Sequence, residues 1–377
     1  MSSQTSQNLI SNFRVFASAL ILGQAPSGGL EGFHDFYAST YFLIGISLTS
    51  RDKIISLFRA CPDQYISGQD ISGSLNISRA AVWKQVKALR ELGFEIEAKH
   101  SQGYRLVAAP DLLLAAEIEN DLNCQLIGQS VFSFAETDST NIQARRLAEE
   151  GALEGTVVVA DRQSAGRGRL GRRWESPVGV NLYSSIILRP KIPIQQAPQL
   201  TFLSAVAVAE TLNEACHLSA KVKWPNDILV NGAKISGLLN EMNAETEQIH
   251  FVILGIGVNL NMIENQFPEE LTYPATSAFL ETGKPVDRLN FLRTFLRCLD
   301  TYYSEFLQEG FAPIRRRWEK LCDMMNMQVE VDQGARSLCG TVVGLDVEGA
   351  LRLQLNNGKI EKILAGDVRP VKKNNEL

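Results

Sequence analysis

QSAGRGRLGRRW, from Gln163 to Trp174, holds four arginines and three glycines between Gly166 and Arg173, and the next acidic residue is Glu175. Repulsion between like charges and the flexibility of glycine would leave such a segment disordered on its own. Guanidinium groups and glycine N–H groups are the groups with which proteins commonly bind phosphate. The stretch therefore predicts a loop that closes over a strongly anionic ligand. A solvated basic loop and a nucleic-acid patch are the alternatives.

The glycines of this stretch also match the dinucleotide-binding spacing, at Gly166, Gly168 and Gly171. That fingerprint requires a strand directly before it, a helix directly after it and an acid about 20 residues further on. Residues 172–177 read Arg-Arg-Trp-Glu-Ser-Pro, which is a poor helix, and residues 189–191 contain no acid. We therefore reject a Rossmann site.

The composition is that of a globular protein. The chain has 377 residues, of which 45% are hydrophobic and 21% charged, and this length suffices for two or three domains. Its net charge of −5 does not by itself indicate a partner. Six cysteines and four histidines are scattered without a Cys-x-x-Cys pair, which predicts a reduced, cytoplasmic protein with no metal site and no disulfide framework.

Residues 1–50 are set apart by their few charges, which are Arg14, Glu31 and Asp35. Both apolar runs in this segment are shorter than the roughly 20 residues needed to cross a bilayer. The run after Arg14 resembles a signal peptide, but the rest of the chain is typical of a cytosolic protein. We expect a disordered extension that belongs to no domain and does not anchor the chain in a membrane.

Residues 51–109 are predicted to form a winged helix-turn-helix domain that ends in a hinge at residues 108–110. The pattern indicates helices at 52–61, 67–75 and 79–92 and then two strands around a turn at 101–103. The third helix has a buried stripe at Val82, Val86 and Leu89.

The same module carries a local positive charge. Residues 79–105 contain six basic and three acidic side chains. A recognition helix in a major groove needs short polar residues for base edges and cations for phosphates. We expect helix-turn-helix residues 67–86 to bind DNA, and the predicted contacts are Asn76, Ser78, Arg79, Lys84 and Lys87. The alternative is a winged helix that makes only protein contacts.

Residues 111–325 alternate apolar runs with helical patterns, which predicts a mixed α/β domain. Ser139, Thr140 and Asn141 precede a predicted helix at 142–150, where they can cap the helix or bind a ligand at its N-terminal end. A predicted strand at 156–160 leads into the arginine-rich stretch.

Further polar and glycine positions lie at the ends of, or within, other predicted strands. Lys223, Asn226 and Asp227 surround a proline-induced turn, and ligand crevices of α/β proteins form at such strand ends. Lys234 begins an apolar strand and points either to solvent or into a crevice. Glycines within the predicted strand 251–258 indicate the close approach of another group or a β-bulge.

Together these residues resemble the biotin–protein ligases of the bifunctional kind that also repress biotin synthesis genes. The matching motifs are Ser139-Thr140-Asn141, Gln163 to Trp174, Lys-Trp-Pro-Asn-Asp at 223–227, Lys234-x-x-Gly237 and Gly255-x-Gly257-x-Asn259. The resemblance covers residues 52–371. It implies an α/β (α+β) catalytic domain of the class II synthetase-like type over 111–325 and an SH3-like β-barrel over 328–371, besides the winged helix.

The resemblance also implies a reaction. Biotin and MgATP would form biotinyl-5′-AMP, and the biotinyl group would pass to a lysine of the biotin carboxyl carrier protein of acetyl-CoA carboxylase. The adenylate would act as corepressor, promote a homodimer and favour binding to operator DNA. No membrane partner is implied.

The family pattern carries over to the following residues. The expected biotin-binding residues are Ser139, Thr140, Asn141, Gln163, Arg167, Gly168, Arg169, Lys234, Gly237, Gly255 and Gly257. The expected catalytic and adenylate-binding residues are Arg169, Arg172, Trp174, Lys223, Asn226, Asp227, Lys234 and Asn259. Residues 263–280 resemble a second mobile segment of the site.

Three rival functions remain open on the sequence. One is a ligase for lipoate or another acyl group on the same core. Another is a ligand-sensing repressor without ligase activity, which the presence of Lys234 and the arginines disfavours. The third is a nucleic-acid binder that uses the arginine loop itself.

Overall fold

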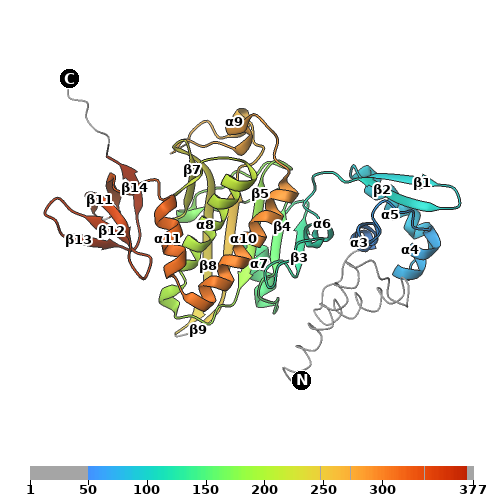
Figure 1. Ribbon diagram of the computed structural model, residues 1–377, viewed down its shortest axis with the longest axis horizontal. Coiled ribbons are helices and arrows are strands. Elements are labelled where there is room, and N and C mark those ends of the chain that lie inside the picture. The colour runs from blue at the N-terminus through green and yellow to red at the C-terminus, as the bar shows by residue number, and fades with distance from the viewer. Residues whose placement is uncertain (1–49, 247, 272, 335, 372–377) are drawn as a thin grey trace. The chain divides into compact units, whose positions relative to one another are not determined.

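The computed structural model describes residues 50–246, 248–271, 273–334 and 336–371. The chain divides into two compact units, Met1–Pro110 and Asp111–Leu377 (Figure 1). Apart from Ser50, the predicted extension over residues 1–50 lies outside the described residues. In the part of the chain that the structure describes, no helix is both long and apolar enough to cross a membrane.

The described part of the first unit consists of three helices and a hairpin. Its elements are α3 (Ser50–Ala60), α4 (Gly68–Leu75), α5 (Arg79–Glu91), β1 (Glu95–Lys99) and β2 (Gly103–Ala108). The predicted stripe of α5 is buried against the apolar face of α3. Ser67 and Ser78 cap α4 and α5, because their hydroxyls accept hydrogen bonds from the N–H groups of Asp70 (3.0 Å) and Ala81 (3.1 Å).

The hairpin of this unit is bonded both to α5, where Nε and Nη2 of Arg90 donate to the carbonyl of Ile96 at 3.0 and 2.6 Å, and to Ile66, which lies ahead of α4. Ile66 and Tyr104 exchange two backbone hydrogen bonds of 2.8 and 2.9 Å. At Gly103, whose φ is 111°, a Cβ would lie 2.0 Å from the carbonyl oxygen of Ile66. Only glycine fits this approach, so the predicted wing is anchored beside α4.

The second unit is built on a seven-stranded mixed sheet. Its strands are β3 (Val131–Phe134), β4 (Val157–Ala160), β5 (Leu182–Leu188), β6 (Lys221–Lys223), β7 (Asp227–Val230), β8 (Ala233–Glu245) and β9 (Gln248–Val258). The spatial order is β3-β4-β5-β9-β8-β7-β6, and only β3 and β4 pair in parallel. Because the antiparallel strands double back, their loops gather the polar segments of distant sequence regions.

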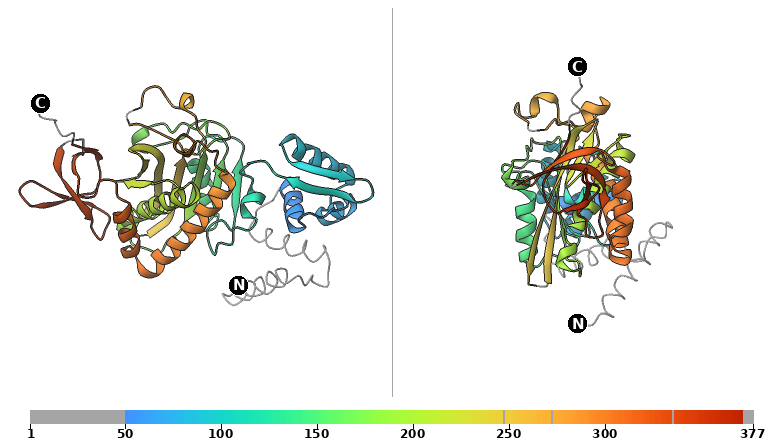
Figure 2. Two further views of the ribbon diagram at one scale, coloured as in Figure 1. Left: turned by 45° about the horizontal axis from the view of Figure 1, so that its top comes forward. Right: turned by 90° about the vertical axis from the view of Figure 1, so that its left-hand side faces the viewer.

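Helices cover both faces of this sheet, as Figure 2 shows. Val158 and Ile187 pack with the small residues of α7 (Thr140–Glu149) on one face. Their sequence neighbours point the opposite way and pack with α8 (Gln199–Ala215) and α10 (Arg288–Glu309). This alternation follows from the two-residue period of a strand, and it leaves the sheet buried on both sides.

The remaining helices are short. They are α6 (Ala115–Glu119), α9 (Ala278–Thr282) and α11 (Ala312–Leu321), with 3₁₀ turns at Arg169–Gly171, Ile194–Gln196 and Glu264–Gln266. Helices α10 and α11 are separated at Gly310, whose φ is 74°. Glycine adopts a positive φ readily, so the chain leaves the helical conformation here before α11 begins.

A five-stranded antiparallel sheet follows α11. It comprises β10 (Gln328–Asp332), β11 (Ser337–Leu345), β12 (Leu351–Gln354), β13 (Ile360–Ile363) and β14 (Asp367–Pro370), in the order β13-β12-β11-β10-β14. Its apolar face belongs to the same core as α8, where Phe202 meets Trp318 edge-on at 5.7 Å. The antiparallel sheet agrees with the β-rich C-terminal part that the resemblance implies over residues 328–371.

Candidate functional site

One cavity of about 430 Å³ gathers the predicted ligand residues of the second unit. Every residue assigned by resemblance to the biotin or adenylate site lines it, from the arginine loop, the loop before α7 and strands β6 to β9. The C-terminal sheet also contributes, through Asp367, Val368 and Arg369. The structure thus brings these residues together, while the role of each stays a prediction.

The arginine loop has a defined backbone. The N–H of Gly168 donates to the carbonyl of Arg172 (2.7 Å), and that of Trp174 donates to Gly166 (3.0 Å). Leu170 occupies the left-handed region at φ 57° at the tip of this turn. Within the folded chain, these internal hydrogen bonds shape the segment into a small hairpin.

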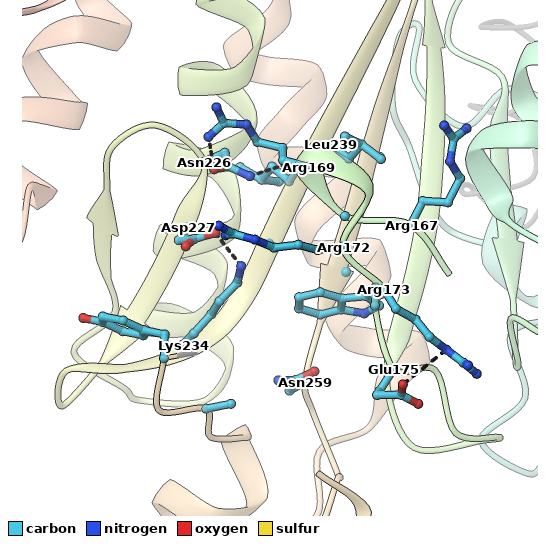
Figure 3. Close-up of a pocket in the computed structure, with 18 of the residues that line it drawn as sticks. Arg167, Arg169, Arg172, Arg173, Glu175, Asn226, Asp227, Lys234, Leu239 and Asn259 are labelled. Atoms are coloured by element: carbon cyan, nitrogen blue, oxygen red, sulfur yellow. Dashed lines mark hydrogen bonds and ion pairs between the residues drawn. The ribbon is translucent and has the colours of Figure 1, made fainter. Parts of the chain in front are cut away.

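Protein groups also compensate the charge of the loop. Arg172 Nη2 lies 2.7 Å from Oδ2 of Asp367, and Arg169 Nη1 donates to Oδ1 of Asn226 at 2.9 Å (Figure 3 labels Arg169, Arg172 and Asn226). Burial raises the pKa of Asp367, but the hydrogen bond and charge of Arg172 outweigh it, and the net pKa is lowered. The C-terminal sheet thereby supplies a counter-charge to the loop.

A second carboxylate lies at the other side of the loop. Glu241 is 3.4 Å from Arg167 and 3.8 Å from Arg145, and it also accepts a hydrogen bond of 2.9 Å from Nδ2 of Asn141. Glu241 stands on β8, 74 residues from Arg167 in sequence. It therefore joins the loop to the start of α7.

Short polar side chains form a buried network at the N-terminal end of α7. Gln163 Oε1 accepts from the backbone N–H (2.8 Å) and the hydroxyl (3.2 Å) of Thr140. The single Ser185 hydroxyl lies within hydrogen-bond distance of Oγ1 of Thr140 (2.8 Å) and of Oδ1 of Asn141 (2.7 Å). Ser139 makes no side-chain cap, so capping does not account for this polar run.

Two lysines of the cavity have different surroundings. Lys234 is ion-paired, with its Nζ 2.6 Å from Oδ1 of Asp227. Lys223 is only 8% exposed, its Nζ lies 3.8 Å from the ring centroid of Tyr273, and among the described residues no carboxylate pairs with it. Burial lowers the pKa of Lys223, although the charge of Asp227 acts in the opposite direction.

The glycines of the cavity are contacted by side chains. A Cβ on Gly257 would lie 2.6 Å from the indole of Trp174, and one on Gly237 would lie 2.9 Å from it. A Cβ on Gly255 would lie 2.2 Å from Oδ1 of Asn141. The close approach expected at these strand glycines is real, but in this structure the approaching groups belong to the protein.

Asn259 is held at both ends of its amide. Its Nδ2 donates to the carbonyl of Thr276 (3.1 Å), and its Oδ1 accepts from Nδ2 of Asn181 (3.3 Å). Residues on either side of Ala275 bond to the backbone of Lys234, at 2.7 and 2.9 Å. The segment over residues 263–280 therefore lines the cavity as predicted from the resemblance, bonded to β8.

The predicted DNA contacts belong to the first unit. Arg79, Lys84 and Lys87 are exposed on α5. Asn76 has φ 50° and caps the C-terminus of α4, and the Ser78 hydroxyl is used as an N-cap. All three cations are exposed, and Lys87 also lies 3.9 Å from Oε1 of Glu91. The two polar residues have local structural roles.

Sequence reasoning missed several participants. Asp367, Arg369 and Tyr273 line the cavity, and Glu241 fixes the loop. Of these residues, only Glu241 could have been noticed in the sequence, because it is a charged residue within the apolar pattern of a strand. In the described parts of the chain, no cluster of three His, Cys, Asp or Glu residues could hold a metal ion.

Three family matches cover most of the described chain. Residues 133–259 match the Biotin/lipoate A/B protein ligase family, residues 50–105 an HTH domain, and residues 326–369 the Biotin protein ligase C terminal domain.

Individual relatives agree with these matches. The Bifunctional ligase/repressor BirA of Bacillus subtilis is 42% identical over 85% of this chain and 98% of its own length. The protein of that name from Escherichia coli is 33% identical over 84% of this chain and 95% of its own. The structure of a biotin protein ligase from Aquifex aeolicus in complex with biotin and ATP has a TM-score of 0.57 and 32% identity, and covers 64% of this chain and 100% of its own.

Proposed function

The chain belongs to the family of bifunctional biotin protein ligases and repressors, and from that premise we propose that it joins biotin to a carrier protein and also binds operator DNA. The observation that carries the ligase proposal is the convergence of the arginine loop, Lys234 and the Thr140–Gln163 network on one cavity. A cationic wall opposite an uncharged hydrogen-bonding wall suits a ligand with phosphates at one end and a neutral ring at the other.

The first reaction would be adenylation. A carboxylate oxygen of biotin attacks the α-phosphorus of MgATP, the bond to the β-phosphate oxygen breaks, and pyrophosphate leaves. Because biotin's carboxylate is already ionised at neutral pH, the step needs positioning and charge neutralisation but no general base. The magnesium ion arrives as part of the nucleotide substrate.

Different cations of the cavity would contact different parts of the substrates. Lys234 would lie between the biotin carboxylate and the α-phosphate, where Asp227 holds its ammonium group in place at 2.6 Å. Arg167, Arg169 and Arg172 would neutralise the phosphates, exchanging their present protein partners for phosphate oxygens. Such an exchange would draw the loop over the ligand and protect a labile mixed anhydride from water.

The neutral wall would select biotin. Ser139, Thr140 and Gln163 offer hydroxyl and amide groups to the ureido ring, and their buried network fixes their orientation. Trp174 would lie against the adenylate, with Asn259 near the adenine. Lys223 and Asn226 line the same cavity and would contact the phosphates, with Asp227 as the partner of Lys234.

The second reaction would be acyl transfer. The ε-amine of an acceptor lysine attacks the acyl carbon of biotinyl-5′-AMP, the bond to the phosphate oxygen breaks, AMP leaves and the amine loses a proton. The acceptor would be the biotin carboxyl carrier protein of acetyl-CoA carboxylase. Six free cysteines, none in a disulfide, are consistent with the reducing cytoplasm in which such a carrier resides.

The test is direct. The full chain is incubated with biotin, MgATP and a carrier domain, and mass spectrometry of the carrier follows the gain of one biotinyl group. Lipoate in place of biotin tests the rival acyl ligase. Turnover with lipoate but not with biotin, or AMP release with neither, would overturn the proposal.

The repressor half of the proposal rests on the helix-turn-helix unit and on the bifunctional relatives. Biotinyl-5′-AMP would act as corepressor, promote a homodimer and strengthen binding to a two-fold operator. Arg79, Lys84 and Lys87 would contact DNA, with Asn76 and Ser78 at the start of α5. Sedimentation with and without adenylate, and gel-shift titrations in parallel, test this half independently of ligation.

A further inference from the structure

Helix α5 exposes an aromatic side chain in the middle of its basic face. Trp83 is 58% exposed. It stands four residues after Arg79 and four before Lys87, so the three side chains follow one line along the helix. The Nζ of Lys87 lies 5.8 Å from the centroid of the Trp83 ring.

Packing of the unit does not require this tryptophan. The buried stripe of α5 is complete without it, since Val82, Val86 and Leu89 are each 1% exposed or less. The two tryptophans Trp224 and Trp318 are, by contrast, buried in the core of the second unit. An exposed indole offers a large apolar area together with a polar N–H, a combination enriched at interfaces.

The charge around Trp83 restricts what can cover it. Residues 76–90 contain four basic side chains and no acidic one, and Glu91, the last residue of α5, lies 3.9 Å from Nζ of Lys87. The adjacent Ala80, three residues before Trp83, is also exposed. The face is therefore a small apolar patch within a cationic surface, which fits a polyanion that carries apolar groups between its phosphates.

Duplex DNA has this character in its major groove. The only apolar group that a base edge presents there is the C5-methyl group of thymine, and helices read it through apolar side chains. Phosphates on both sides of the groove would meet Arg79, Lys84 and Lys87.

We propose that Trp83, together with Ala80, reads thymine methyl groups of the operator and is a specificity-determining residue of this protein. The inference rests on the DNA-binding half of the proposed function and adds to it a base-reading residue and the base it reads. Lys84, in contrast, would contribute to affinity for any sequence.

The experiment uses the full chain with biotin and MgATP. A binding site is selected from random duplex DNA with the wild-type protein, and each thymine of that site is then replaced in turn by uracil, which lacks only the methyl group. Dissociation constants are measured across a salt series for wild type, Trp83→Ala and Lys84→Ala. Leu153→Ala, in the second unit, is the matched control for loss of an apolar side chain of similar exposure (56%).

For wild type, uracil at one or two positions should weaken binding about three- to ten-fold. Trp83→Ala should bind the selected site about ten-fold more weakly, be insensitive to uracil at those positions and keep the wild-type salt slope. Lys84→Ala should keep the uracil effect and lower the salt slope by about one. Leu153→Ala should match wild type, and all variants should retain ligation.

Three results would overturn the inference. They are equal binding of uracil sites by wild type, unchanged affinity of Trp83→Ala, and loss of self-association by Trp83→Ala in the absence of DNA, which would assign Trp83 to a contact between two copies. Failure of wild type to select any duplex would remove the DNA-binding function itself and the inference with it. Circular dichroism melting of each variant verifies that α5 is intact.

Discussion

Lys234 and Asp227 face each other across neighbouring strands, with Nζ 2.6 Å from Oδ1. The pair lies in the wall of the cavity, and the ammonium group is also 5.5 Å from the ring of Trp174. A flexible lysine is thereby held at one point before any substrate binds, which lowers the entropy that positioning would otherwise cost.

Removal of this cation should slow adenylation. We expect Lys234→Ala to lower the rate on the order of 10²-fold or more, because a preorganised electrostatic contact to the developing charge is lost. Arg169→Ala should have an effect of similar size. Biotin-dependent exchange of pyrophosphate into ATP measures both.

The controls are matched by residue type. Lys359→Ala and Arg146→Ala each remove an exposed cation paired with a nearby glutamate, and both should leave exchange unchanged. Wild-type exchange in Lys234→Ala would contradict the assigned role.

The ion pair between Arg172 and Asp367 can be tested by exchanging its charges. Arg172→Asp should lose the pair and the phosphate contact together, so exchange falls and the loop becomes more sensitive to protease. Adding Asp367→Arg restores the pair. We expect the double variant to regain protease resistance but not exchange, because the cation now stands on β14.

Recovery of both properties in the double variant would mean that Arg172 acts only by anchoring the loop. Recovery of neither would mean that the pair does not hold the loop. Because both side chains are partly exposed, the pair itself should contribute little to global stability.

Glycine at position 257 should be required for ligand binding. In Gly257→Ala the added Cβ would lie 2.6 Å from the indole of Trp174, so the ring must move. We expect the affinity for the adenylate to fall about ten-fold or more, with a smaller effect on folding, because the displaced group belongs to a surface loop. Isothermal titration calorimetry with a non-hydrolysable adenylate analogue measures this affinity.

Gly73→Ala is the corresponding control. No atom lies within 4 Å of the added Cβ, and the position is helical. The substitution should stabilise the first unit by up to about 1 kcal/mol and leave the ligand affinity unchanged. If Gly257→Ala and wild type bind the ligand with equal affinity, ligand binding does not depend on the present position of Trp174.

The buried lysine should make ATP binding pH-dependent. Since burial lowers the pKa of Lys223 below its ordinary 10.5, the side chain loses its charge at a lower pH than an exposed lysine. The KM for ATP should rise as pH increases through that lowered value. In Lys223→Arg the KM for ATP should not rise over this pH range, because the guanidinium stays charged.

The lowered pKa of Lys223 also makes the free energy of unfolding depend on pH. Between the lowered pKa of the folded chain and 10.5, the unfolded chain binds the proton and the folded chain does not, so this group makes the free energy of unfolding rise with pH. The difference in free energy of unfolding between wild type and Lys223→Met should therefore change with pH only in that window. A constant difference would contradict a lowered pKa.

The sequence by itself predicted the local elements and the residues that line the cavity. Helix α5 was predictable because its buried residues recur every three or four positions and Ser78 and Gly93 mark its ends. The motifs around Thr140, Gln163, Lys223 and Gly257 were recognisable because each is contiguous in the chain.

Only the tertiary structure decided which groups meet. Arg172 and Asp367 are 195 residues apart, and Trp174 covers a glycine from β9. Such pairings depend on strand order and on packing of the C-terminal sheet, and neither produces a periodic pattern in sequence. In isolation the segment was expected to be disordered, because the counter-charges of Asp367 and Glu241 lie near it only when distant strands have assembled around it.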